Sequence, residues 1–380
     1  MNLTDYFDPI DFSQINTEDS PLGKYGLGPA VEVFSSAVTT KGLIKTHIAI
    51  FGVPETNGKR QPKGKSSPDR IRNSLYKLAA FETNLKIIDL GNLKAAKSPK
   101  GTFLALRDII EYLNEFNIVS VVLGGSQELT LGICEAFRNQ KFFWLSAVDA
   151  VLDVKKGTET FHSKNYLTRL FRNFPQLFHF SLIGYQQHLV SEQLLQKTGS
   201  FGSHLRLGAL RDSIKQAELL LRNTNVLSFD MGAIKYNEAP GTSLQNPNGL
   251  YGEEACQLAH YAGLSPRLMV FGCFETVEKN DPDGRTAALA AEIIWYFLKG
   301  VSARKRSVLT TAYKVEIEGL DHPIVFRHER ELNRWWFDVK AITGETMEIA
   351  CSEEEYRQAA SNEIPERWLR FIQKMDTHSK

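Results

Sequence analysis

Closely spaced cysteines are lacking in this sequence of 380 residues. Its four cysteines are far apart along the chain: Cys134, Cys256, Cys273 and Cys351. Disulfide-rich domains and structural zinc sites are built from cysteines at short, paired spacings, so neither is indicated here. Scattered cysteines are typical of proteins in a reducing compartment, and we therefore expect a cytoplasmic protein.

Long apolar runs and an excess of either charge are also lacking. No stretch approaches the roughly 18 apolar residues of a membrane-spanning helix, so we expect no membrane contact. Residues 1–20 are polar and acidic, unlike a secretory signal. The 45 lysines and arginines nearly balance the 44 aspartates and glutamates, for a net charge of +1, which argues against a nucleic-acid partner.

Apolar residues make up 42% of the chain, which favours a large folded core over disorder. Within residues 46–300, short apolar runs alternate with amphipathic segments. We predict buried strands at 47–53, 86–91, 118–125, 141–150, 177–185, 225–233 and 267–275. We predict helices at 69–81, 102–116, 129–138, 210–224 and 284–300. This alternation is typical of an α/β fold with a parallel sheet covered on both faces.

Three segments are predicted along the chain. Residues 1–45 form an N-terminal arm, residues 46–300 the α/β domain, and residues 301–380 a smaller, β-rich C-terminal extension. In the extension, polar and apolar residues alternate with a period of two, which predicts antiparallel strands. Trp335 and Trp336 would face opposite sides of such a strand, one packing on the core and the other either packing or contacting a protein partner.

Polar residues follow three of the predicted strands. They lie in the segments GGSQELTLG (124–132), DAVLD (149–153) and SFDMGAIKYNEAPGT (228–242). Ligand sites of parallel sheets lie at the carboxyl ends of strands, and alternate strand residues face one way, so Asp149 and Asp153 should converge. Clustered carboxylates raise one another's pKa values and need a metal ion, a lysine or dense hydrogen bonding. The candidate lysines are Lys155, Lys156 and Lys235.

Six segments in register carry a resemblance to a known family. They are IAIFGVPE, SPDRIRNSLYKL, VVLGGSQEL, WLSAVDAVLD, LSFDMGAIKYNEAPG and FETVEKNDPDGRTAALAAEIIWYFL. Over residues 45–300 the chain resembles the ureohydrolases (arginase, agmatinase and formimidoylglutamase), and the last segment leans toward the formimidoylglutamase branch. The resemblance implies a three-layer α/β arginase-like fold with a mainly parallel sheet. It also implies two manganese ions that polarise a bridging hydroxide, which attacks a guanidinium or formimino carbon.

The resemblance implies six metal-ligand positions, of which this sequence retains three. The retained positions are Asp149, Asp153 and Asp230. Gln127 stands where the family has its first histidine, Val151 where it has the second, and Gly232 where it has an aspartate. Lys235 stands at a further position where an aspartate is usual.

The losses are uneven between the two implied metal positions. One would be formed by Gln127 and the three retained aspartates, whose oxygens suit a single divalent cation such as Mn²⁺ or Mg²⁺. The other would need Val151 and Gly232, which have no side-chain ligand. Alternatively, the aspartates hold no metal and are compensated by hydrogen bonds and a lysine, with Gln127 as a hydrogen-bonding residue.

Two further residues are candidates for catalysis under the resemblance. Glu278 matches a late glutamate of the family and could recognise a guanidinium-like group, because carboxylate and guanidinium pair bidentately. An ordinary strand-end charge is the alternative. His162 lies in a loop resembling the substrate-side histidine region of the family, although the neighbouring pattern differs, and a solvated loop histidine is the alternative.

Three hypotheses for function follow. The first is a pseudoenzyme that binds no cofactor and acts by binding a protein partner or a small metabolite. The second is a hydrolase of a linear amidine or guanidine C–N bond that uses one remaining divalent cation. The third makes residues 301–380 an interaction module on an inert core. A homo-oligomer is possible by analogy with the family.

Overall fold

A computed structural model of the chain describes residues 1–10, 22–34, 43–56, 59–60, 66–155, 160–199, 201–304 and 310–378. The chain divides into two compact units, Met1–Ala303 and Arg304–Lys380. Each unit is described by itself.

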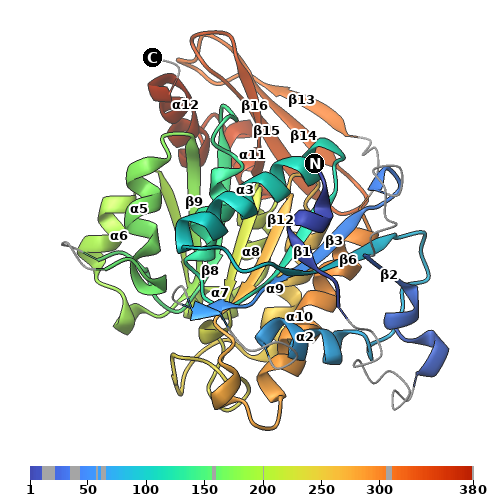
Figure 1. Ribbon diagram of the computed structural model, residues 1–380. Helices are drawn as coiled ribbons and strands as arrows, with labels where there is room; N and C mark the ends of the chain where they lie inside the picture. Colours follow the sequence, from blue (N-terminus) through green and yellow to red (C-terminus); the bar gives the residue numbers. More distant parts are fainter. Residues whose placement is uncertain are drawn as a thin grey trace. The chain divides into compact units, whose positions relative to one another are not determined.

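The first unit is built around a ten-stranded sheet (Figure 1). Its strands are β1 (Phe7–Asp8), β2 (Val31–Val33), β3 (Ile48–Val53), β6 (Ile87–Leu93), β7 (Val119–Gly124), β8 (Phe143–Val148), β9 (Leu177–Tyr185), β10 (Gly202–Arg206), β11 (Val226–Asp230) and β12 (Val270–Phe274). The order is β1-β6-β3-β7-β12-β11-β8-β9-β10, with β2 also on β6. Only β1 pairs antiparallel in this sheet, so the predicted mainly parallel sheet is confirmed.

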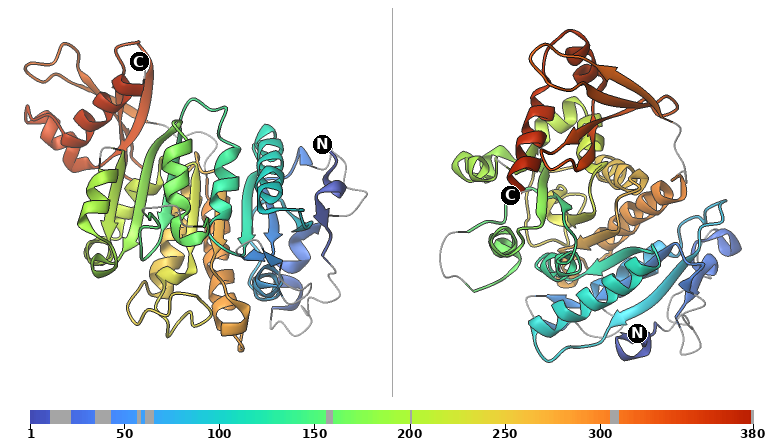
Figure 2. Two further views of the ribbon diagram at one scale, coloured as in Figure 1. Left: turned by 60° about the vertical axis from the view of Figure 1, so that its left-hand side comes forward. Right: turned by 90° about the horizontal axis from the view of Figure 1, so that it is seen from above.

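Helices cover both faces of the sheet, as Figure 2 shows for this unit. They are α2 (Ser67–Leu75), α3 (Pro99–Glu115), α4 (Leu129–Glu135), α5 (Tyr166–Asn173), α6 (Glu192–Thr198), α7 (Leu207–Asp212), α8 (Lys215–Leu221), α9 (Gly252–Leu264) and α10 (Arg285–Ser302). In β3, Ile48 and Ile50 join the core with α2 and α7–α10, whereas Ala49 and Phe51 join the core with α3–α6. This alternation makes the three layers of the predicted fold.

Several predicted boundaries differ from the structure. The helix predicted at 210–224 is two helices, α7 and α8, because the backbone is extended at Ser213 (φ −156°, ψ 96°). The helix predicted at 69–81 ends at Leu75, and Ala79 forms a β-bridge with Gly26. The strand predicted at 225–233 ends at Asp230, where a 3-10 turn, η7 (Met231–Ala233), begins.

The second unit contains a four-stranded antiparallel sheet in the order β13-β14-β15-β16. Its elements are β13 (Thr311–Val315), β14 (Ile324–Glu329), β15 (Arg334–Lys340), β16 (Thr346–Cys351), α11 (Glu353–Ala360) and α12 (Glu366–His378). The predicted β-rich extension is therefore confirmed. Trp335 is 6% exposed and stacks between His328 and Tyr356, with ring centroids 4.0 and 4.5 Å away. Trp336 is half-buried on the opposite side of β15.

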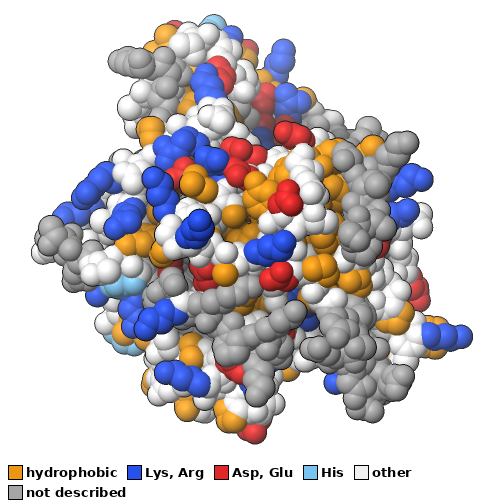
Figure 3. Space-filling model, in the orientation of Figure 1, with side chains coloured by type: hydrophobic (Ala, Val, Ile, Leu, Met, Phe, Trp, Pro, Cys, Tyr) orange, Lys and Arg blue, Asp and Glu red, His pale blue; other side chains and the backbone are white. Residues whose placement is uncertain are grey.

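A short hairpin, β4 (Glu55–Thr56) with β5 (Lys59–Arg60), follows β3. Among the described residues, no helix is long and apolar enough to cross a membrane. On the face shown in Figure 3, side chains of both charges are interspersed over the described residues.

Candidate functional site

Four neighbouring strands bring polar side chains to one edge of the sheet. β7, β12, β11 and β8 are adjacent and parallel, so their carboxyl ends lie together. Asp149 follows β8, Asp230 ends β11, and Asp153 lies four residues beyond Asp149. Each of these three aspartates offers a carboxylate oxygen within 4.8 Å of the other two. The side chains are buried, with exposed fractions of 1%, 8% and 6% for Asp149, Asp230 and Asp153. We call them the acidic cluster.

The acidic cluster is held by turns rather than by continued strands. β8 ends at Val148, so residues 149–153 do not have the strand geometry that the sequence argument assumed. Instead, Asp149 Oδ1 accepts a hydrogen bond of 2.9 Å from the Val151 amide. Asp230 Oδ1 likewise accepts one of 2.5 Å from the Gly232 amide. The side chains of Asp149 and Asp230 are thus each fixed by the backbone two residues further along.

Burial and mutual repulsion raise the pKa values of the whole acidic cluster. Burial is the largest cause for each carboxyl, because a charge is poorly solvated there. The second cause is the negative charge of a neighbouring carboxylate. Asp153 raises the pKa of Asp149, Asp230 raises that of Asp153, and Asp149 raises that of Asp230. The acidic cluster therefore keeps protons to a higher pH than isolated carboxyls do.

Gln127 faces the acidic cluster from the end of β7 and is fully buried. In the orientation that satisfies both ends of its amide, Nε2 donates to Asp149 Oδ2 and Asp153 Oδ2, each at 3.2 Å. Oε1 then accepts from Ser228 Oγ at 3.2 Å and from the Tyr166 hydroxyl at 3.3 Å. In this arrangement Gln127 is a hydrogen-bond donor to the carboxyls and not an oxygen ligand.

Glu275 is a fourth acidic residue of the site, and sequence reasoning missed it. It follows β12 with a positive φ of 65°, and its amide donates to the Gly125 carbonyl at 2.8 Å. Its carboxylate accepts from the backbone N–H of Gln127 at 2.8 Å and from Ser243 Oγ at 3.2 Å. Its charge raises the pKa of every aspartate in the acidic cluster. Its position directly after an apolar strand was the available signal.

Glu278, the predicted recognition residue, lies in a 3-10 turn, η8 (Glu278–Asn280). Its carboxylate is 3.9 Å from Arg70 Nε, and 26% of its side chain is exposed. Arg70 also donates to the Asp281 carbonyl. The carboxylate that acts electrostatically on the acidic cluster is therefore that of Glu275, while Glu278 pairs with a guanidinium of the same chain.

His162 begins another 3-10 turn, η5 (Ser163–Asn165), and is half-buried. Its Nδ1 accepts a hydrogen bond of 3.1 Å from the Lys164 amide, which gives it a capping role. The exposed Lys164 is the cation whose charge lowers the pKa values of Asp153 and Asp230. This loop thus contributes positive charge to the acidic cluster through a residue next to the predicted one.

Of the three lysines predicted as counter-charges, the structure describes two, Lys235 and Lys155. Lys235 Nζ is 3.9 Å from the centroid of the Tyr251 ring, in a cation–π contact. Lys155 is exposed, and Lys156 lies outside the described residues. The compensation observed within the described residues comes from Lys164, from backbone amides and from Gln127.

Comparison with known proteins decides the family. The model of the arginase family matches residues 46–299. The chain belongs to the arginase family.

Curated relatives of this chain include formimidoylglutamases. One from Citrobacter koseri is 23% identical over 273 residues, which cover 68% of this chain and 87% of the relative. One from Photorhabdus laumondii is 24% identical over 268 residues, which cover 66% and 84%. These similarities support the resemblance of the sequence to the formimidoylglutamase branch.

Solved structures confirm the arginase-like fold. A formiminoglutamase of Trypanosoma cruzi with Mn²⁺ superposes with a TM-score of 0.62 at 21% identity, covering 68% of this chain and 95% of that one. The formimidoylglutamase of Bacillus subtilis superposes with a TM-score of 0.64 at 18% identity, covering 73% and 92%.

The side-chain donors differ between the two metal positions that the family implies. Asp149, Asp153, Asp230 and the oxygen of Gln127 are the donors available for one cation, provided that the Gln127 amide is reversed. At the other implied position, Val151 and Gly232 offer no side-chain donor. A Cβ added to Gly232 would lie 2.9 Å from Asp230 Oδ1 and 3.3 Å from Leu244 Cβ, so an aspartate there requires the Asp230 carboxylate to move.

Proposed function

We propose that this chain is a non-catalytic member of the arginase family that acts by binding a protein partner or a small metabolite. The observation that carries the proposal is the donor set, because Val151 and Gly232, which stand at the second implied metal position, carry no ligating side chain. A single cation does not give the two-metal activation of a bridging hydroxide.

Hydrogen bonds and protons at the first metal position support the proposal. Raised pKa values keep protons on the acidic cluster, and the Gln127 amide donates to two of its carboxyls. Backbone amides of Val151 and Gly232 supply further donors. A cation would have to displace these protons and reverse the amide, which lowers its affinity.

Elemental analysis of protein purified in Mn²⁺ tests this proposal. We expect well below one manganese ion per chain, and no formamide or urea released from formiminoglutamate, agmatine, guanidinobutyrate or arginine. A variant that combines Gln127→His, Val151→His and Gly232→Asp restores the family's donors and is the matched comparison. Near-stoichiometric manganese together with turnover in the unmodified chain would refute the proposal.

One observation favours a second candidate, a hydrolase of a linear amidine or guanidine C–N bond with one cation. The three carboxylate oxygens lie within 4.8 Å of one another, and with the Gln127 amide reversed its Nε2 donates to Ser228 Oγ at 3.2 Å. Four oxygen donors then face a single Mn²⁺ or Mg²⁺, which supplies Lewis acidity when bound. This candidate requires that Asp230→Asn abolish both cation binding and turnover.

The compartment and the assembly also remain proposals. All four cysteines are buried and form no disulfide, which supports a reducing compartment such as the cytoplasm. A homo-oligomer and the absence of a nucleic-acid partner stay predictions, which sedimentation and binding assays would check.

A further inference from the structure

A groove on the outer side of α9 and α10 shares no residue with the acidic cluster. It encloses about 830 Å³ and is open to solvent. Six of its lining residues come from α10, at the spacing of one helix face: Arg285, Ala288, Leu289, Glu292, Tyr296 and Lys299. The opposite wall is formed by the outer face of α9 with Glu253, Cys256, Gln257 and His260. At about 1.5 Å per residue, the α10 wall from Arg285 to Lys299 is about 21 Å long.

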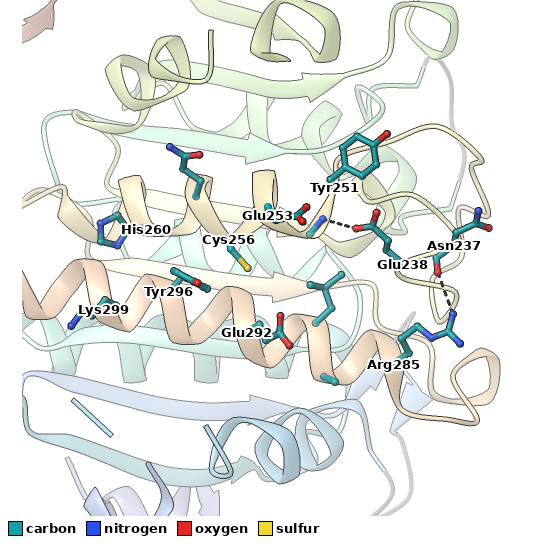
Figure 4. Close-up of a pocket in the computed structure, with 14 residues that line it drawn as sticks. Asn237, Glu238, Tyr251, Glu253, Cys256, His260, Arg285, Glu292, Tyr296 and Lys299 are labelled. Atoms are coloured by element: carbon teal, nitrogen blue, oxygen red, sulfur yellow. Dashed lines mark hydrogen bonds between the residues drawn. The ribbon is translucent and has the colours of Figure 1, made fainter. Parts of the chain in front are cut away.

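The middle of the groove is both acidic and apolar, as Figure 4 shows. Glu253 and Glu292 lie on opposite walls there, on either side of Cys256. Within the described part of the chain, no hydrogen bond or ion pair engages either carboxylate. Both charges act on the Cys256 thiol, whose pKa burial raises to about 12, so both carboxylates lie near it. Burial also raises the pKa of Glu292, and none of the cations in the described ranges offsets this rise.

The cations of the groove lie at its ends. Arg285 donates to the Asn237 carbonyl at 3.2 Å at one end, and Lys299 lies at the other. Tyr296, 43% exposed, adds an aromatic ring beside the acidic middle. A complementary ligand therefore has apolar groups along its length and positive charge at its middle.

We propose that this groove binds an amphipathic helix of a partner protein, with an apolar stripe flanked by lysine or arginine at its central turns. The groove has two helical walls and no strand edge, so it suits a packed helix rather than an added strand. A second copy of this chain is disfavoured, because a two-fold contact at the groove would place Glu253 and Glu292 against the same carboxylates.

Synthetic helical peptides of four to five turns test this inference. The probe has leucines at helix-face spacing with lysines beside the central ones. One control peptide has glutamates in place of the lysines, and another has the same composition in scrambled order. Fluorescence anisotropy should show the basic amphipathic peptide binding about tenfold or more tighter than either control, and less tightly as salt is raised.

Variants of the chain locate the binding. Glu253→Lys with Glu292→Lys should weaken binding of the basic peptide about tenfold or more. Tyr296→Ala should weaken it about tenfold through loss of the aromatic contact. Glu82→Lys with Glu115→Lys, which makes the same charge change at exposed positions outside the groove, should change affinity less than about twofold.

Three results would overturn the inference. They are equal binding of the basic and control peptides, full binding by the groove double variant, and self-association that this double variant abolishes. None of these results depends on the metal content of the acidic cluster, so failure of this inference and failure of the proposed function are distinguishable.

Discussion

Replacing Asp149 by asparagine is expected to stabilise the protein, although this aspartate is fully buried. The asparagine Oδ1 can keep the hydrogen bond from the Val151 amide, and its new amide nitrogen replaces Oδ2. Gln127 can reverse its own amide to meet that nitrogen, with its Nε2 then donating to Ser228 Oγ. The substitution thus removes a charge that repels Asp153 and Asp230 and keeps the packing.

The stabilisation expected from Asp149→Asn should increase with pH. The folded pKa values of the acidic cluster lie well above the value of about 3.9 in an unfolded chain. Above about pH 3.9, the folded state binds more protons than the unfolded state. The contribution of the acidic cluster to folding stability therefore falls as the pH rises through the folded pKa values. A buried polar group without full compensation typically costs about 1–3 kcal/mol. Asp149→Asn should therefore raise the free energy of unfolding by an amount of this order at pH 8 and by much less at pH 5.

Urea unfolding of both proteins between pH 5 and pH 8 measures this difference. The exposed Asp212→Asn is the matched control and should leave the curve unchanged. The reasoning would be refuted if Asp149→Asn lowered stability at pH 8, because that is the behaviour of a carboxylate that binds a cation in the folded state.

Three further predictions concern stability and reactivity. Trp335→Ala removes the ring stacked on His328 and Tyr356 and should cost about 3–5 kcal/mol, seen as rapid proteolysis within Arg304–Lys380; resistance equal to wild type would contradict it. Arg72→Met leaves the buried Asp89 without its 2.7 Å ion pair and should cost about 3–5 kcal/mol in urea unfolding, and a loss below about 1 kcal/mol would count against it. Cys134, Cys273 and Cys351 are buried outside the groove and should resist an aromatic disulfide reagent until the chain unfolds, whereas rapid reaction of one of these thiols in the native chain would contradict their burial.

The fold was predictable from the sequence because apolar runs and helical periodicity report burial directly. β3, β7 and β8 are buried on both faces and therefore appear as uninterrupted apolar segments. The break between α7 and α8 was not predictable in this way. Its apolar spacing continues across Ser213, and only the extended backbone there ends the helix.

The site was predictable in part. Carboxyl ends of parallel strands converge, so the meeting of Asp149, Asp153 and Asp230 followed from the positions of the strands. The sequence did not predict which glutamate of FETVE faces the acidic cluster, because that depends on the positive φ of Glu275. The counter-charge from Lys164 also arises from the folding of a loop and leaves no pattern in the sequence.

Anomalous diffraction at the manganese edge, from crystals grown in excess Mn²⁺, tests the central claim most directly. The account predicts no pair of anomalous peaks beside Asp149, Asp153 and Asp230, and electron density for the Gln127 amide in hydrogen-bonding distance of the carboxyls. Two peaks about 3–4 Å apart at these strand ends would contradict it.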